Sequence, residues 1–217
     1  MLQRISKTEL IQVQAALLVA IALQFVALKV SSELLPGSQF VIVVIELALA
    51  VLLGFTARVR HSRLHNLHHL MSVVLLALIS LANISALIFV LHSLIVNHIP
   101  TGGEQLLVSA IAIFITNIIV YALWYWEIDS PGLTGRRWSK HDKDFQFTQQ
   151  DLAAEFPGWQ PQFGDYLFLA ITNAVNFAPA ETRPLSQQAK ALMASQSLVS
   201  VFTLALVIAR SVSILGS

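Results

Sequence analysis

The chain alternates between long apolar stretches and short polar connections. A helix needs about 20 apolar residues to cross a hydrocarbon core of about 30 Å. Five stretches reach that length, at residues 10–30, 38–57, 70–96, 106–126 and 185–215. A sixth, residues 163–178, is apolar but short, which is typical of a re-entrant segment. The pattern predicts an all-α, polytopic membrane protein with five full transmembrane helices plus a short re-entrant or sixth helical segment.

The same pattern divides the chain into three segments. Residues 1–128 form a four-helix transmembrane region, and residues 129–162 form a charged and aromatic interfacial segment. Residues 163–217 contain the short apolar stretch and the final transmembrane helix. Because aromatic and polar residues alternate in the middle segment, we expect it to lie along the membrane surface.

Composition supports a membrane protein and excludes several functional classes. Of the 217 residues, 56% are hydrophobic and 12% are charged, whereas soluble domains carry about 25% charged residues. The formal net charge of +1 argues against a nucleic-acid partner. The chain has no cysteine, which excludes thiol catalysis, and it carries none of the common nucleotide-binding or hydrolase motifs. We therefore expect neither an enzyme nor a cofactor.

The distribution of Lys and Arg predicts the orientation of the helices. Basic residues occur in the N-terminal flank and in the polar segments 57–69 and 127–165. The connections 31–37 and 97–105 contain none. With four crossings before residue 127, the three basic regions fall on one side, and Lys and Arg favour the cytoplasmic side. The N-terminus is therefore predicted to be cytoplasmic.

Glu46 lies near the middle of the second apolar stretch. An ionised carboxylate there costs about 2.5 to 3.5 kcal/mol, so we expect Glu46 to be neutral, paired or beside water. Gln24, Asn83, Thr116 and Asn117 are polar, uncharged residues of other stretches that are available as partners. Two interpretations stay open. Glu46 handles protons or cations, or it is a neutral carboxyl that joins helices by hydrogen bonds.

A histidine cluster follows the second stretch. On a helix, His61, His65 and His69 share one face, and a histidine pair spaced i, i+4 can hold a metal. No carboxylate accompanies them, and three arginines of the same loop oppose a cation. We therefore expect no metal site, and we interpret the loop as a basic patch that contacts anionic lipid.

The C-terminal quarter of the chain resembles part of a known channel architecture. An aromatic segment begins at Asp165, a Thr-Asn pair follows at Thr172 and Asn173, and Pro184-Leu185 opens a long helix. This order resembles the pore helix, filter and inner helix of two-helix potassium channels. No glycine occurs between Asp165 and Leu215, although a carbonyl-lined filter needs glycine. The resemblance therefore implies a pore-loop-like scaffold in residues 163–217 without the glycine filter and without potassium selectivity.

A second resemblance covers the C-terminal half. The runs ALWYWEID (122–129), DYLFLAITNAVNFAPAETRPL (165–185), AKALM (189–193) and VIARSVSIL (207–215) are similar to those of a group of uncharacterised bacterial inner-membrane proteins. This resemblance implies a multi-pass protein of the bacterial inner (cytoplasmic) membrane and carries no activity with it.

The sequence favours a channel-like or transport protein with an ion as possible substrate. We expect a homo-oligomer in membrane lipid, since a two-helix hairpin cannot line a pore alone. The candidate pore residues are polar positions of the last two helical stretches: Thr172, Asn173, Asn176, Gln196, Ser200, Thr203 and Arg210. The last four share one helix face, which is equally typical of helix packing. The alternative is a non-transporting accessory or structural membrane protein whose charged segment docks a soluble partner.

The cysteine-free chain permits a direct test of orientation. Single cysteines placed at Ser62 and Ser139 should be shielded from an impermeant thiol reagent in intact cells, because both lie in basic segments. A cysteine at Thr101, in a connection without Lys or Arg, should react. Labelling at Ser62 together with protection at Thr101 would reverse the predicted orientation.

Overall fold

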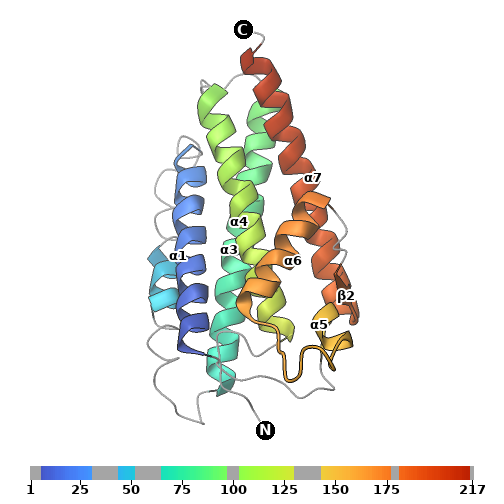
Figure 1. Cartoon of the computed structure of the whole chain (residues 1–217). Helices are drawn as coiled ribbons and strands as arrows, with labels where there is room; N and C mark the ends of the chain where they lie inside the picture. Colours follow the sequence, from blue (N-terminus) through green and yellow to red (C-terminus); the bar gives the residue numbers. More distant parts are fainter. Residues whose placement is uncertain are drawn as a thin grey trace.

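The protein is a bundle of long helices with a small two-stranded sheet at one end (Figure 1). The computed structural model describes residues 6–30, 44–51, 65–96, 103–129, 143–176 and 181–215. Its elements, in chain order, are α1 (Lys7–Val30), α3 (His65–Val96), α4 (Gly103–Asp129), β1 (Phe145–Phe147), α5 (Thr148–Asp151), α6 (Phe163–Asn176), β2 (Thr182–Pro184) and α7 (Gln187–Leu215). Residues 44–51 are also helical.

Four of these helices are long and apolar enough to cross a membrane. The spans are Lys7–Ala27, Leu70–His92, Glu104–Asp129 and Gln187–Ala209. They confirm the first, third, fourth and fifth predicted stretches. Only residues 44–51 of the second predicted stretch, 38–57, belong to the described part of the chain, so five full crossings stay a prediction. The labelling positions Ser62, Thr101 and Ser139 lie outside the described residues.

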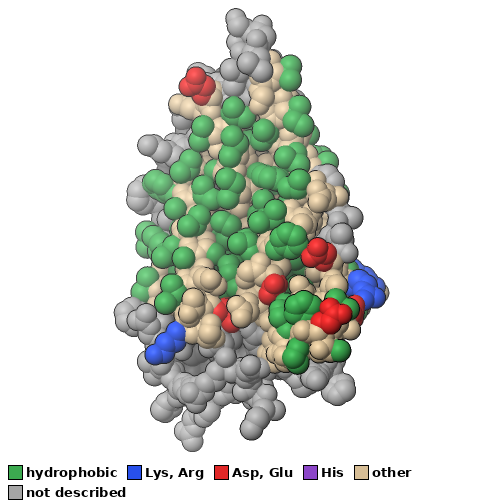
Figure 2. Space-filling model, viewed as in Figure 1, with side chains coloured by type: hydrophobic (Ala, Val, Ile, Leu, Met, Phe, Trp, Pro, Cys, Tyr) green, Lys and Arg blue, Asp and Glu red, His purple; other side chains and the backbone are tan. Residues whose placement is uncertain are grey.

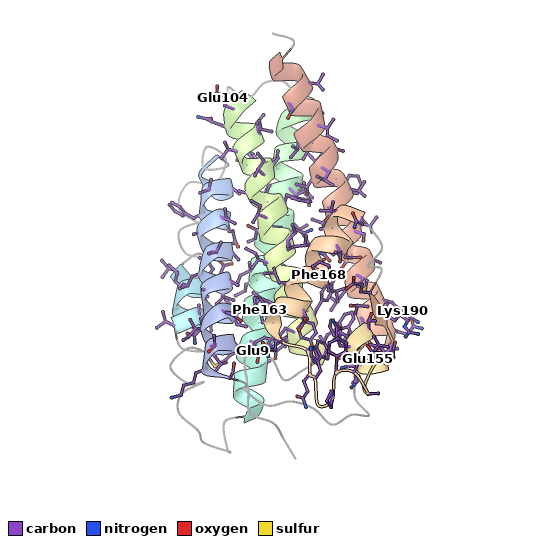
Figure 3. The ribbon with its side chains drawn as sticks, viewed as in Figure 1. Glu9, Glu104, Glu155, Phe163, Phe168 and Lys190 are labelled. Atoms are coloured by element: carbon purple, nitrogen blue, oxygen red, sulfur yellow. The ribbon has the colours of Figure 1, made fainter. Side chains whose placement is uncertain are left out.

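The surface of the long helices is apolar. Large side chains such as Ile11, Leu81 and Val212 are more than 60% exposed. Soluble monomers rarely expose such extended apolar surface, whereas lipid tails cover it without cost. On the face in Figure 2 the hydrophobic side chains cover the upper and middle parts, and most charged side chains gather in the lower part. Glu104 marks one end of the bundle, and Glu9, Glu155 and Lys190 lie toward the other (Figure 3).

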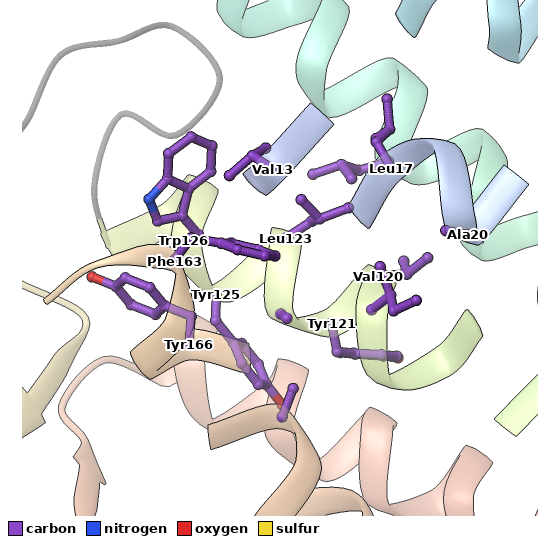
Figure 4. Close-up of a cluster of buried hydrophobic side chains, with 14 of the residues drawn as sticks. Val13, Leu17, Ala20, Val120, Tyr121, Leu123, Tyr125, Trp126, Phe163 and Tyr166 are labelled. Atoms are coloured by element: carbon purple, nitrogen blue, oxygen red, sulfur yellow. The ribbon is translucent and has the colours of Figure 1, made fainter. Parts of the chain in front are cut away.

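Helix α4 is the central element. It packs against α1, α3, α6 and α7. Its last two turns are largely buried: Leu123, Tyr125 and Trp126 are at most 1% exposed, and the acids Glu127 and Asp129 are buried as well. Figure 4 shows Val120 and Leu123 turned toward α1, and Tyr125 toward α6. The remaining helices therefore assemble around α4.

Asp129, the last residue of α4, anchors the polar end of the bundle. Its Oδ1 accepts hydrogen bonds from the backbone N–H groups of Asp144 (2.6 Å) and Phe145 (2.9 Å). Its Oδ2 accepts a hydrogen bond from the hydroxyl of Tyr166 on α6 (2.6 Å). One carboxyl group therefore fixes the start of β1 and the first turn of α6 to the end of α4.

The sheet joins two segments that are distant in sequence. β1 pairs with β2 in antiparallel register, with Gln146 opposite Arg183. The sequence predicts that residues 129–162 lie along the membrane surface, and it predicts no strand there. The short helix α5 is held in place by residues 181–183, which follow α6 in the chain. The Thr148 hydroxyl donates to the carbonyl oxygen of Glu181 (2.7 Å), and Arg183 forms an ion pair with Asp151.

Helices α6 and α7 begin at the same end of the bundle and run in the same direction (Figure 1). The backbone N–H of Phe163 donates to Glu9 at the start of α1 (3.2 Å). Ten residues later, Asn173 contacts α7 near Met193 and Gln196. Helix α6 has 14 residues, which is about 21 Å at 1.5 Å per residue and is shorter than the hydrocarbon core.

Removing the Asp129 carboxyl group should loosen the whole polar end. Asp129→Ala leaves three donors without their acceptor. We expect the free energy of unfolding in detergent to fall by about 3 kcal/mol or more, since each orphaned buried donor costs about 1–3 kcal/mol. Glu155→Ala is the control, because Glu155 is exposed on the same end. Equal stability of the two variants would contradict the anchoring role.

Candidate functional site

The buried core is divided into two apolar clusters by a layer of polar side chains. On α1, Gln24 lies between Ile21 of one cluster and Ala27 of the other. On α3, Asn83 lies between Ile79 and Ala86 in the same way. Polar residues thus occupy the boundary between the clusters on both helices.

The other helices repeat this order. On α4, Thr116 and Asn117 follow Ile113 of one cluster and precede Ile119 of the other. On α7, Ser200 and Thr203 lie between Met193 and Leu206. Glu46 joins the layer through its hydrogen bond to Gln24. We call this layer the polar belt; its members, all at most 4% exposed, are Gln24, Glu46, Asn83, Thr116, Asn117, Ser200 and Thr203.

Hydrogen bonds within the belt connect neighbouring segments. The Gln24 side-chain amide donates to Oε1 of Glu46 (3.0 Å). The Asn83 amide donates to the carbonyl oxygen of Ile113 on α4 (3.3 Å), and the Asn117 amide donates to the Ser200 hydroxyl on α7 (3.0 Å). These bonds confirm that polar residues of different spans meet inside the bundle, as expected for polar groups that lipid cannot satisfy.

Part of the belt lacks hydrogen-bond partners. Within the described residues, four buried atoms make no hydrogen bond: Oε1 of Gln24, Oε2 of Glu46, Oδ1 of Asn83 and Oγ1 of Thr116. All four are oxygens, and they belong to four different segments. Buried polar atoms are normally bonded, and each exception needs an explanation. The oxygens on Gln24, Glu46 and Asn83 are acceptors for which the described residues supply no donor, and the Thr116 hydroxyl can both donate and accept.

A second polar cluster lies nearer the sheet and is fully bonded. The Tyr125 hydroxyl donates to Oε1 of Gln196 (2.5 Å), and the Asn173 amide donates to the same oxygen (2.7 Å) and to the carbonyl oxygen of Met193 (3.0 Å). The Gln196 amide donates to the carbonyl oxygen of Ala170 (2.8 Å). We call Tyr125, Asn173 and Gln196 the amide cluster. It joins α4, α6 and α7.

The structure separates the candidate pore residues into distinct environments. Asn173 and Gln196 meet in the amide cluster, whereas Ser200 and Thr203 lie in the polar belt. The hydroxyl groups of Thr172 and Thr203 bond to carbonyl oxygens of their own helices.

Two further candidates lie at the ends of their helices. Asn176 is exposed at the end of α6. Arg210 belongs to α7, and its side chain is outside the described part. A pore-lining role of these residues stays a prediction, while the bonds of Asn173, Gln196 and Ser200 match the helix-packing alternative.

The outer face of α6 is apolar. Phe168, Ile171 and Val175 are spaced i, i+3 and i+7, and they are 52%, 42% and 52% exposed. Phe168 points away from the bundle in Figure 3. The polar side of α6 therefore faces α4 and α7 of its own chain, and the opposite side suits lipid or another apolar surface.

The predicted histidine cluster is largely outside the description. His61 is not among the described residues, and His65 and His69 belong to α3 without described side chains. In the part of the chain that is described, no group of three or more metal-binding residue types comes together.

Buried acids at the polar end were missed by the sequence interpretation. Glu9 and Glu127 are 2% and 1% exposed, although both were assigned to aqueous or flanking segments. Oε1 of Glu9 accepts a hydrogen bond from the Trp126 indole N–H (3.1 Å). Their burial could have been predicted from their position, because each acid lies beside apolar residues at a helix end, where a neighbouring helix can supply hydrogen-bond donors.

Comparisons with protein-family models, with curated proteins and with solved structures found no match to this chain. The candidate site therefore rests on geometry alone, and the polar belt is its strongest part.

Matched substitutions on α6 distinguish helix packing from pore lining. Asn173→Leu should lower the free energy of unfolding by about 2 kcal/mol, because Gln196 and Met193 lose a buried donor. Asn176→Leu should change it by less than about 0.5 kcal/mol, since Asn176 is exposed. Chemical unfolding in one detergent measures both. If Asn173→Leu were as stable as wild type, the amide cluster would not be holding α6 in place.

Proposed function

We propose that the protein is a transport protein of the bacterial inner membrane that moves a small cation through the polar belt. The observation that carries this proposal is the set of four buried belt oxygens that have no hydrogen-bond partner among the described residues. Buried oxygens that are not satisfied by the protein suit a cation, because a cation accepts lone pairs from several groups at once.

The position of the belt supports this assignment. The belt lies between two apolar clusters. An ion that crosses the bundle would therefore pass through the belt on its way from one apolar layer to the other. Glu46 supplies a carboxyl group inside a predicted span, and ionisable residues in spans commonly mark ion or proton pathways. The belt therefore combines an acidic group with neutral oxygen ligands.

The C-terminal hairpin has a supporting role in this proposal. Helix α6 acts as a re-entrant segment that starts from the cytoplasmic side and braces α4 and α7 through the amide cluster. Its length of 14 residues and its parallel course with α7 favour this role. Its apolar outer face suits contact with lipid or with a second copy of the chain in a homo-oligomer. The oxygen-rich belt, with no glycine filter, is expected to discriminate poorly between K⁺ and Na⁺.

A second candidate function is that of a non-transporting accessory protein that docks a soluble partner. It is favoured by the ordered polar end, where Leu152 and Phe156 are 41% and 44% exposed beside the paired Arg183 and Asp151. This alternative assigns the belt to helix packing alone.

Ion flux in liposomes distinguishes the two functions. Purified protein should move protons or alkali cations faster than empty liposomes do, and Glu46→Gln should abolish this flux while the protein stays folded. Glu104→Gln is the matched control, because Glu104 is an exposed acid in the first turn of α4. Fluorescent indicators of internal pH and of Na⁺ or K⁺ report the flux. Wild-type protein that leaves the liposomes as tight as empty ones would favour the accessory function.

A further inference from the structure

Glu46 and Gln24 form a pair whose hydrogen bonds are incomplete. Their side chains are 0% and 1% exposed, and the Gln24 amide N–H donates to Oε1 of Glu46 at 3.0 Å. The two remaining oxygens of the same pair, Oε2 of Glu46 and Oε1 of Gln24, have no partner among the described residues. Both unpaired atoms thus belong to groups that are already in contact.

Counting hydrogens shows what the pair lacks. If Glu46 is ionised, the pair contains three acceptor oxygens, and its only hydrogens are those on the amide nitrogen of Gln24. Two oxygens then stay buried without a donor, which destabilises the folded state. One proton on Oε2 converts that atom into a donor and leaves Oε1 of Gln24 as its acceptor. A single proton on Oε2 therefore supplies the donor that the two unpaired oxygens of this pair lack.

The charges around the pair favour a proton over an ionised carboxylate. On the helices that carry the belt, no described basic side chain lies within about two turns of a belt residue. Lys7, Glu9, His92, Glu104 and Lys190 are the described titratable side chains toward the ends of these helices. The others, Tyr121, Tyr125, Glu127 and Asp129, lie in the last turns of α4, on the sheet side of the belt. An unpaired negative charge in an apolar bundle is costly, and protonation removes it.

We propose that Glu46 and Gln24 form a proton-binding site, in which the O–H of Glu46 donates to Oε1 of Gln24 while the Gln24 amide donates back to Oε1 of Glu46. The two groups then form a closed pair of hydrogen bonds between α1 and the helical segment 44–51. The role of this site in transport rests on the proposed function, but the site itself does not. The inference names the proton as the cation that binds in the belt.

Infrared spectroscopy tests the site without any measurement of flux. A protonated carboxyl group absorbs in a band separate from that of a carboxylate, and the band shifts in D₂O. The probe is the purified protein in phosphatidylcholine liposomes at neutral pH, in Na⁺ and in Na⁺-free buffer. We expect Glu46→Gln to remove one carboxylic-acid band, and Glu104→Gln to leave that band unchanged, since Glu104 is exposed.

Gln24→Leu keeps the test decisive if Glu46→Gln does not fold. It removes the acceptor and the donor of the pair but keeps the acid, so the carboxylic-acid band should persist and move to higher frequency. A band that does not respond to Gln24→Leu would contradict the pairing.

Two other outcomes would overturn the proposal. If Glu46→Gln removes carboxylate absorption instead, Glu46 is ionised. If added Na⁺ converts the acid band into a carboxylate band, the site prefers a metal cation to a proton.

The infrared experiment tests the proton site and the flux experiment tests the transport function, so each can refute its own proposal without refuting the other. A protonated Glu46 in a protein that moves no ion would uphold the site and refute the transport function. Glu46-dependent flux with an ionised Glu46 would refute the proton site and uphold transport.

Discussion

Polar side chains inside this bundle must bond to one another, because lipid offers no hydrogen bonds to replace those of water. Helix α4 meets this constraint for most of its polar side chains, which bond to residues of other helices or of β1. The partners of its polar side chains lie on α7, α3, α1, β1 and α6: Asn117 with Ser200, Tyr121 with Ser195, Trp124 with Ser80, Tyr125 with Gln196, Trp126 with Glu9, and Asp129 with Phe145 and Tyr166. These bonds fix which helix faces which side of α4.

The amide cluster and the polar belt solve this constraint differently. In the amide cluster, one glutamine oxygen receives two donors, and the glutamine amide finds a backbone carbonyl in turn. That arrangement is what tight packing of helices requires, and it explains why the short helix α6 stays in place. In the belt, four oxygens have no hydrogen-bond partner within the part of the chain that the structure describes. Because unsatisfied acceptors destabilise a folded protein, their presence in the belt favours a ligand there over a purely structural role.

The features that depend on local hydropathy were predictable from the sequence. Helix α3 contains no Asp, Glu, Lys or Arg across its 32 residues, and hydropathy over such a length leaves membrane crossing as the main solution. Glu46 stood out for the same reason, since a carboxyl group is rare in an apolar stretch, and Gln24 was among its proposed partners. The short apolar stretch 163–178 likewise predicted a re-entrant or sixth helical segment; α6 is a helix of 14 residues there, and whether it crosses or re-enters stays a prediction.

The partners of polar residues were decided by the tertiary structure. Asn173 and Asn176 differ little in sequence, yet one is buried in the amide cluster and the other is exposed, because Asn176 is the last residue of α6, one turn beyond the contact that Asn173 makes with α7. Asp129 looked like the start of an aqueous segment, but the return of the chain brings β1 and Tyr166 to its oxygens.

The sequence by itself therefore determined the positions of four helices that are long and apolar enough to cross a membrane, and it singled out Glu46 as an acid within an apolar stretch, since these features depend on local hydrophobicity. The polar belt and the sheet depend on contacts between residues far apart in the chain, and only the packing around α4 decided them.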